Sequence, residues 1–348
     1  MVRVQSGVVS AEAPTSPIDA LGSLDHVPRS RLATLPTALE RGPGLPGGAR
    51  LWVKRDDLTG LGVGGNKARK LEFLCGEALR AGARTLVTVG AGQSNHCRMT
   101  AAAGAVLGLE VHLVLSGERP ARPTGNQLLA EMFGAQLHYV GCPANHWGEL
   151  EIAREQLTEE LTAAGAAPHS MPIGGSTPTG AVGYLVAYLE LVEQSRRRRI
   201  RPAAVVHASS SGGTHAGLVA GRALLRAHGS DELPPVLAIG VAKGVVLGVP
   251  DVRQLAADTL ALIGSDAPVL DEDVEIDDRW LGPDYGVATS AGAEGIRWAA
   301  LHGGWILDAT YTGKGFAGLL GNAATGRWRA GEEVVFVHTG GLPAVFAR

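Results

Sequence analysis

The chain has 348 residues, of which 45% are hydrophobic and 19% charged, with a formal net charge of −3 at pH 7. This composition is typical of a folded globular protein, and the even balance of charge argues against a dedicated nucleic-acid or membrane-surface protein. Three widely spaced cysteines, Cys75, Cys97 and Cys142, are too few for a disulfide framework or a zinc site. We therefore expect a cytoplasmic protein that binds neither nucleic acid nor membrane and holds no metal.

The first residues, 1–30, lack a long apolar run, and their prolines and acids would interrupt a secretory signal. No window of the chain approaches the roughly 18 apolar residues that a membrane-spanning helix needs. We predict that residues 1–30 form a mobile N-terminal arm.

From residue 50 onwards, short apolar runs alternate with glycine-rich turns and alanine-rich helical stretches. The first series predicts strands at 50–57, 85–91, 111–117 and 137–141, and helices at 67–83, 94–108 and 127–136. Near-continuous apolar strands separated by helices are typical of a parallel sheet that is covered on both faces.

A second series predicts a helix within 171–194 and strands at 203–209, 236–242, 305–311 and 333–341. We therefore predict an α/β fold of two domains, each with a mostly parallel twisted sheet flanked by helices. Residues 1–69 and 179–348 are assigned to a larger domain and residues 70–178 to a smaller one. The basic run Arg196 to Arg199 is interpreted as a solvated helix end and not as a nucleic-acid patch.

The stretch HASSSGGTHAGLVAG, at 207–221, lies where a predicted strand ends and a helix begins. Backbone N–H groups at a helix start favour an anion, glycines permit close approach, and hydroxyls add donors. The residues that fit this role are Ser210, Ser211, Gly212, Gly213 and Thr214. A Walker loop and a dinucleotide fingerprint are both missing here, so the stretch predicts either a phosphate cradle or only a tight connection.

A second strand-to-helix turn, GAGQSNHCRM, places Gln93, Ser94 and Asn95 at a helix start. Such residues are good helix N-caps, but the strand ends of α/β sheets are also where ligands bind. These three side chains are therefore candidates for holding a carboxylate.

Lys67 follows two glycines and an asparagine at another predicted helix start. The field at a helix start disfavours a protonated amine, which lowers its pKa and suits the lysine to Schiff-base formation. Without further evidence, a surface lysine is the simpler interpretation. We expect Arg69 and Lys70 to contact solvent or to form local ion pairs.

A Schiff-base lysine, a phosphate cradle and a carboxylate-binding turn together indicate pyridoxal 5'-phosphate as the cofactor. Seven longer motifs along the chain carry a resemblance to a known family. They are KRDDLTG, GGNKARKLEF, GAGQSNHCRMTAAAG, IGGSTPTGAVGY, SGGTHAGL, YTGKGFAGLL and HTGGLPAVFA. In this order they resemble the D-cysteine desulfhydrase and 1-aminocyclopropane-1-carboxylate deaminase family of fold-type-II pyridoxal phosphate enzymes, related to the tryptophan synthase β chain. The resemblance runs from about Pro36 to Phe346.

The resemblance implies a role for each matching residue. Lys67 is expected to bind the cofactor covalently and to move the α-proton, and Asn95 to meet the cofactor's phenolic oxygen as well as the substrate. Gln93 and Ser94 are expected to contact the substrate carboxylate, with Ser94 as a candidate acid or base. The phosphate loop is expected at Ser210, Ser211, Gly212, Gly213 and Thr214. Tyr285 and Tyr311 are expected to line the substrate pocket and to complete the catalytic set with Lys67 and Ser94.

Two threonines favour one branch of that family. After Tyr311 and His338 the cyclopropane deaminases are expected to carry glutamate and leucine, whereas this chain has Thr312 and Thr339. A neutral hydroxyl near the pyridine nitrogen leaves it unprotonated and favours prompt loss of a β leaving group. The predicted activity is β-elimination from D-cysteine, a small amino-acid substrate, to give pyruvate, sulfide and ammonia.

Other activities stay open at this point. Asp284 replaces an expected glycine, and residues 288–292 replace an expected proline-asparagine segment, which leaves room for an L-cysteate sulfo-lyase or a cysteine-conjugate C-S lyase. A cyclopropane deaminase and a non-catalytic binder of a phosphorylated ligand are the remaining alternatives. The resemblance also implies a homodimer.

Overall fold

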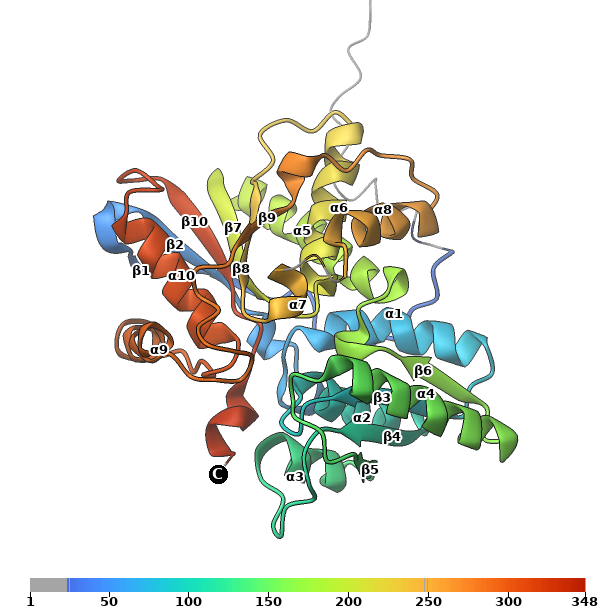
Figure 1. Ribbon diagram of the computed structural model, residues 1–348. Coiled ribbons are helices and arrows are strands. Elements are labelled where there is room, and N and C mark those ends of the chain that lie inside the picture. The colour runs from blue at the N-terminus through green and yellow to red at the C-terminus, as the bar shows by residue number, and fades with distance from the viewer. Residues whose placement is uncertain (1–23, 25, 247, 249, 348) are drawn as a thin grey trace, which may run out of the picture.

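The computed structural model describes residues 24, 26–246, 248 and 250–347, whose strands form two separate sheets (Figure 1). The strands are β1 (Leu39–Gly44), β2 (Arg50–Lys54), β3 (Thr85–Gly90), β4 (Glu110–Leu115), β5 (Gln136–Tyr139), β6 (Pro168–Met171), β7 (Pro202–Ser209), β8 (Val236–Gly240), β9 (Glu275–Asp277) and β10 (Glu333–Val337). The helices are α1 (Lys67–Arg80), α2 (Asn95–Leu107), α3 (Gly125–Met132), α4 (Trp147–Ala163), α5 (Pro178–Arg198), α6 (Gly213–Ala227), α7 (Lys243–Val246), α8 (Val252–Leu262), α9 (Ser290–Gly303) and α10 (Thr312–Ala324).

The larger sheet has the strand order β1-β2-β10-β7-β8-β9. Its neighbouring strands are parallel except for the antiparallel pair β1 and β2. Side chains alternate across a strand, so Val334 and Phe336 of β10 pack in the same cluster as α9 and α10, whereas Val335 and Val337 pack with α5, α6 and α8. The sheet is therefore covered on both faces, as Figure 1 shows.

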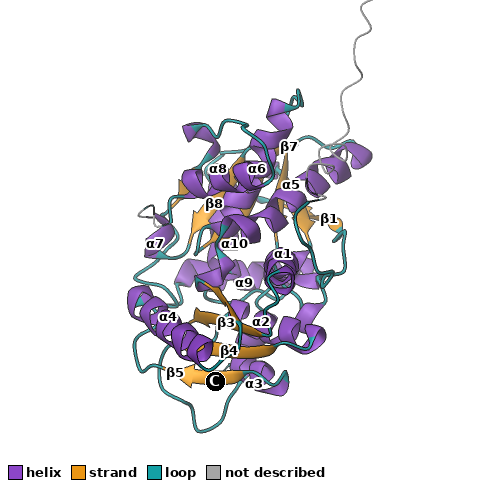
Figure 2. Ribbon diagram, turned by 90° about the vertical axis from the view of Figure 1, so that its right-hand side faces the viewer, coloured by secondary structure: helices purple, strands orange, loops and turns teal. Residues whose placement is uncertain are grey.

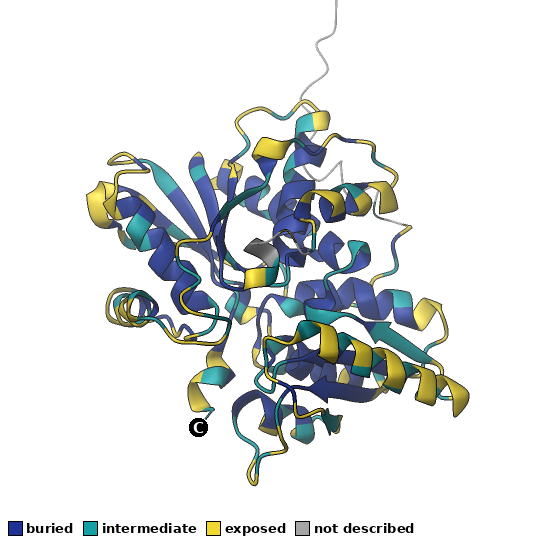
Figure 3. Ribbon diagram, in the orientation of Figure 1, coloured by how far each residue is buried: buried dark blue, intermediate teal, exposed yellow. Residues whose placement is uncertain are grey.

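The smaller sheet has the order β5-β4-β3-β6, and all its pairs are parallel. Helix α4 covers one face, where Leu150 packs with Val89 and Val114, and α1, α2 and α3 supply the cluster on the other face (Figure 2). The central strands β3 and β4 are mostly buried, while α4 carries exposed residues along its outer side (Figure 3). The prediction of two mostly parallel sheets flanked by helices is confirmed.

The small-sheet strands all come from residues 85–171, and the larger sheet takes its strands from both flanks of that range. This arrangement agrees with the predicted assignment of 70–178 to one domain and 1–69 with 179–348 to the other. The assignment itself stays a prediction, since α1 begins at Lys67 and runs across its first boundary.

One predicted strand, at 305–311, is wrong. Trp305 and Leu307 are buried as an apolar strand would require, but the following backbone turns. Asp308 causes the turn because its carboxylate accepts the N–H groups of Thr310, Tyr311 and Thr312, which a strand would direct to a neighbour. Local capping of α10 therefore prevails over the apolar pattern.

The structure describes only part of the predicted N-terminal arm, because residues 1–23 and 25 lie outside the described residues. The structure differs from the prediction at residues 26–30, which pack against α1. Val27 is buried, Ser30 donates its N–H to the carbonyl of Glu72 over 2.7 Å, and Arg29 pairs with the Glu72 carboxylate at 2.6 Å. These contacts tie the chain to the first buried helix.

The basic run Arg196 to Arg199 lies exposed at the end of α5, as predicted for a solvated helix end. Among the described residues, no helix is long and apolar enough to cross a membrane.

Candidate active site

A cavity of about 750 Å³, a volume that includes space open to solvent, lies where strands of both sheets end. Its walls include the carboxyl ends of β3 and β7 and the segment after β10, the edge at which α/β sheets bind ligands. The predicted site residues that line it are Lys67, Ser94, Asn95, Ser210, Ser211, Gly212, Thr214, Tyr285, Tyr311 and Thr339. Segments that lie far apart in the sequence, at Lys67 and Thr339, are thus brought together.

Lys67 is the first residue of α1 and faces this cavity. Gly64 and Gly65 precede it with φ of 77° and 131°, and this left-handed backbone allows the helix to start beside the segment after β10. There Asn66 donates its N–H to the carbonyl of Thr339 over 3.0 Å. Within the described part of the chain the Lys67 amine has no hydrogen-bond or ion-pair partner, and burial lowers its pKa to about 8. A larger neutral fraction near physiological pH suits the amine to attack a carbonyl.

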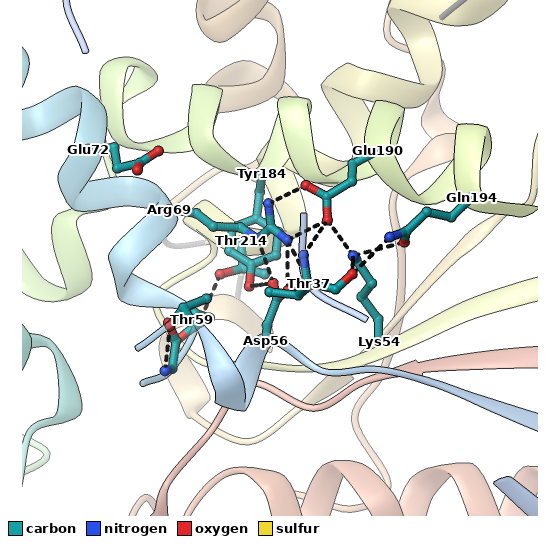
Figure 4. A network of polar contacts seen from close by, with 12 residues as sticks. Thr37, Lys54, Asp56, Thr59, Arg69, Glu72, Tyr184, Glu190, Gln194 and Thr214 are labelled. Atoms are coloured by element: carbon teal, nitrogen blue, oxygen red, sulfur yellow. Dashed lines mark hydrogen bonds and ion pairs between the residues drawn. The ribbon is translucent and has the colours of Figure 1, made fainter. Parts of the chain in front are cut away.

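A buried ionic network holds the first turn of α1 in place (Figure 4). Arg69, two residues after Lys67, donates to Asp56 through Nε and Nη2 at 2.9 Å each and pairs with Glu190 of α5 at 2.9 Å. Asp56 also accepts the hydroxyl of Tyr184 over 2.6 Å. Arg69 was expected to contact solvent or form a local ion pair; it does form ion pairs, but it is buried and joins α1 to α5 and to the turn after β2.

Lys70 is a candidate site residue that the sequence interpretation missed. It too was expected near solvent, but it is fully buried and donates to the carbonyl of Gly174 at 2.8 Å and to Ser176 Oγ at 3.2 Å. Burial and the nearby charge of Lys67 hold its pKa well below the ordinary range. The spacing of Lys67 and Lys70 was the available signal, because residues three apart lie on the same side of a helix.

The predicted phosphate cradle lies beside these two amines. Helix α6 starts at Gly213 after Gly212, whose φ is 77°, and Ser176 links Ser211 to the Gly213 N–H with hydrogen bonds of 2.9 and 3.3 Å. A side-chain carbon at Gly213 would come within 2.6 Å of Lys70 Nζ, so glycine keeps the helix start open. Gly213 itself is not among the residues that line the cavity.

The groups around the cradle fit a phosphorylated cofactor. Ser209 Oγ is buried on the cavity wall, and no described residue partners it. The start of the 15-residue helix α6 directs backbone N–H groups to the same side as the hydroxyls of Ser210, Ser211 and Thr214. A phosphate would satisfy these donors, and its negative charge would favour the protonated form of buried Lys70.

The turn before α2 divides into residues that face the cavity and one that does not. Ser94 caps α2 by accepting the Cys97 N–H over 3.2 Å, and Asn95 Oδ1 accepts the amide of Asn126 over 3.0 Å. Gln93 is outside the lining, with its amide bonded to Thr124 and Asn126 at the start of α3. Its predicted contact with a carboxylate stays a prediction.

The two tyrosines meet on the other wall, where the hydroxyls of Tyr285 and Tyr311 are hydrogen-bonded. Burial raises the pKa of Tyr285 to about 12 and that of Tyr311 well above its ordinary value, so both hydroxyls stay protonated at neutral pH. Trp147, which the sequence interpretation missed, also lines the cavity and lies edge-on to Tyr285 with ring centres 6.0 Å apart. Nothing in the local pattern around Trp147 indicated this contact.

The two threonines occupy different positions. Thr339 lines the cavity, whereas the buried Thr312 directs its hydroxyl to the Asp308 carboxylate over 2.8 Å and is outside the lining. Asp308, also missed, reaches the cavity and accepts the Tyr311 N–H over 2.7 Å, and burial raises its pKa. An aspartate shortly before the helical stretch, in DATYTGKG, was a usable capping signal.

The fold and site define an α/β enzyme of a particular class, in which a lysine of low pKa faces a phosphate cradle between two sheets. The sequence pattern of the pyridoxal-phosphate dependent enzyme family matches residues 31–340, and the chain belongs to this family. Pyridoxal phosphate is therefore its cofactor.

The chain is 40% identical over 336 residues to a D-cysteine desulfhydrase of Serratia proteamaculans, covering 93% of this chain and 97% of that protein. A D-cysteine desulfhydrase of Salmonella typhi is 39% identical over 338 residues, with coverages of 94% and 98%. The solved structure of an ACC deaminase homologue superposes with a TM-score of 0.83 at 36% identity, covering 94% of this chain and 96% of that chain. A fungal L-serine ammonia-lyase from Rhizomucor miehei, at 18% identity and a TM-score of 0.61 over 90% and 95% of the two chains, shows the shared fold.

Proposed function

We propose that this protein is a D-cysteine desulfhydrase, which converts D-cysteine and water into pyruvate, hydrogen sulfide and ammonia. The observation that carries the choice of substrate is the 40% identity to a D-cysteine desulfhydrase along nearly the whole of both chains. Thr339 on the cavity wall supports it, since a neutral hydroxyl there favours elimination over reactions that need a protonated ring.

Pyridoxal phosphate, when bound, draws electrons away from the Cα of the attached amino acid. In this chain Lys67 would hold it covalently, and its phosphate would be held by Ser210, Ser211, Thr214 and the start of α6, with Lys70 behind them. Asn95 and Thr339 would contact the ring. These assignments rest on the cavity lining and on the buried Ser209 hydroxyl, which no described residue partners.

Lys67 then has the chemistry of a general base, because a pKa of about 8 leaves a useful fraction of the amine neutral near pH 7. Ser94 would donate its hydroxyl to the substrate carboxylate. The paired hydroxyls of Tyr285 and Tyr311 stay protonated and would hydrogen-bond to the β-sulfur as negative charge develops on it.

The decisive experiment mixes the cofactor-loaded protein with D-cysteine and measures sulfide and pyruvate separately. We expect both products in equal amounts, and neither from Lys67→Ala. A loaded, yellow protein that produces neither would reject D-cysteine as the substrate.

A panel of related amino acids tests the alternatives. Sulfite and pyruvate from L-cysteate would indicate a sulfo-lyase, and pyruvate from larger cysteine conjugates would indicate a C-S lyase of broader specificity. Release of 2-oxobutanoate from 1-aminocyclopropane-1-carboxylate would favour the deaminase activity. The structural similarity to the ACC deaminase homologue motivates this test. A protein that stays colourless with added cofactor would be a binder of another phosphorylated ligand.

We also propose that the protein acts as a homodimer in the cytoplasm. The family resemblance supports the dimer, and the three cysteines, all free and buried, are compatible with a reducing compartment. Light scattering after gel filtration tests the dimer, and a monomeric mass would reject it.

A further inference from the structure

The segment that carries Tyr285 is tied to two other segments by one carboxylate, that of Asp284. One oxygen accepts the N–H of Tyr285 over 2.7 Å, and the other lies 3.0 Å from Nδ2 of Asn145 and 3.2 Å from Nζ of Lys243. Asn145 lies just before α4, which covers the smaller sheet, whereas Lys243 starts α7 after β8 of the larger sheet. Figure 2 shows α7 and α4 on the same side of the molecule. Asp284 therefore bridges the two halves of the fold.

This bridge lies at the edge of the candidate active site. Trp147, two residues after Asn145, and Tyr285, next to Asp284, both line the cavity and contact each other edge-on. Asn145 and Gly286 beside them are exposed, so the cavity wall meets solvent here. Breaking the contact between Asn145 and Asp284 would let Trp147 and Tyr285 separate and widen the cavity at this edge.

The ion pair between Asp284 and Lys243 is partly exposed to solvent, so it can break at little cost in free energy. Lys243 is more than half exposed, at 56%, and Asp284 is exposed at 27%, so water and salt weaken their attraction. The site contrasts with the pair of Asp56 and Arg69, in which both side chains are buried. A weak, solvent-exposed contact suits a gate better than a fixed support.

We propose that Asp284 is a positioning residue that latches Tyr285 to the α4 side of the active-site cavity, and that opening of this latch controls access of amino acids to Lys67. The inference rests on the proposed function only in taking this cavity as the place where the amino acid reacts. It applies to any amino-acid substrate of the enzyme.

The test uses hydroxylamine, a small amine-class nucleophile that removes the cofactor from Lys67, and follows loss of the visible absorption band. Asp284→Asn keeps an acceptor for the Tyr285 N–H but loses the charge facing Lys243, and Asn145→Ala removes the bond across the two halves. We expect each variant to react about threefold faster or more than the wild type. The double variant should react no faster than the faster single variant, because both changes open one latch.

The dependence of the hydroxylamine reaction rate on salt separates a latch from a merely structural role of Asp284, because a structural role predicts no change of rate with ionic strength. The wild-type rate should rise when ionic strength increases from roughly 0.05 M to roughly 0.5 M, whereas the rate of Asp284→Asn should stay constant. Glu232→Gln is the matched control, since it removes an exposed ion pair with Arg201, 2.7 Å long, outside the cavity lining. It should react at the wild-type rate.

Unchanged rates in both Asp284→Asn and Asn145→Ala would overturn the latch, as would equal salt dependence in the wild type and Asp284→Asn. If Asp284→Asn fails to load cofactor, Asn145→Ala decides alone. The outcome is independent of the substrate assignment, because the hydroxylamine reaction needs bound cofactor but no turnover of D-cysteine. Failure of D-cysteine to give pyruvate would instead reject the proposed function and leave the latch result standing.

Discussion

Replacing Asp56 by asparagine removes the negative centre of the buried network beside Lys67. Asp56 has no exposed surface and accepts four hydrogen bonds, two from Arg69, one from Thr37 Oγ1 at 2.7 Å and one from the Tyr184 hydroxyl. An asparagine fits the space but supplies only one acceptor oxygen and turns an NH₂ group toward these donors. Arg69 keeps Glu190 as its acidic partner and Thr37 Oγ1 as a further acceptor.

Two considerations give the size of the effect. Burial alone would raise the pKa of Asp56, but the charge and hydrogen bonds of Arg69 prevail and lower it from 3.8 to about 2. This lowering corresponds to stabilisation of the fold by roughly 2 kcal/mol at neutral pH. Breaking a buried ion pair on one side typically costs about 3–5 kcal/mol. Since Arg69 retains Glu190, we expect the free energy of unfolding to fall by about 2–3 kcal/mol.

Urea unfolding followed by tryptophan fluorescence and far-ultraviolet circular dichroism measures this change in wild type and Asp56→Asn. The pH dependence has a defined sign, because a carboxyl with a lowered folded-state pKa stabilises the fold above its unfolded pKa. The difference between the two proteins should be full above about pH 4 and should disappear as the pH falls toward about 2. Cofactor affinity should also fall, because Arg69 lies in the first turn of α1 with Lys67.

Glu193→Gln serves as the control, since Glu193 is partly exposed and pairs with the exposed Arg197 on α5. Its unfolding free energy should stay within about 0.5 kcal/mol of the wild type. The reasoning would be refuted by an Asp56→Asn variant that loses less than about 1 kcal/mol, or whose loss is the same at pH 7 and near pH 2.

Three further changes test the site. Lys70→Met should weaken cofactor binding roughly tenfold or more in an absorbance titration, because it removes a buried amine that a bound phosphate would keep protonated; unchanged affinity would place the phosphate elsewhere. The rate of covalent cofactor uptake by the apo-protein should rise with pH through about 8, where the Lys67 amine loses its proton, and a midpoint near 10.5 would contradict the lowered pKa. Tyr311→Phe should lower kcat on D-cysteine by about 10²-fold with little change in stability, and full activity would remove that hydroxyl from the mechanism.

Local pattern was sufficient for much of this protein. Apolar runs separated by helical stretches predicted both sheets, because each buried strand and each helix of a parallel α/β sheet has its own recognisable residue pattern. The glycines and hydroxyls of 207–221 predicted the cradle for a similar reason, since a helix start binds anions through its own backbone. Lys67 could be recognised from its glycine-rich helix start once the other motifs were considered with it.

Local pattern failed where hydrogen bonds within a turn override an apolar run, and where a side chain's partner lies far along the chain. The run at 305–311 has the composition of a strand, yet capping by Asp308 turns its backbone away from the sheet. Lys70 and Arg69 look like surface charge in sequence, and only the packing of α1 on α5 buries them. Their partners Ser176 and Glu190 lie more than 100 residues away.

The sequence by itself determined most strands of the two sheets, several of the helices between them and the anion-binding turn, and it supplied the lysine, because hydrogen bonding and hydrophobic periodicity act over a few residues. Only the tertiary structure decided which side chains surround that lysine. It placed Trp147 against Tyr285, left Gln93 outside the cavity and joined Asp284 to Asn145. These contacts depend on how two sheets meet, and no short stretch of sequence contains both partners.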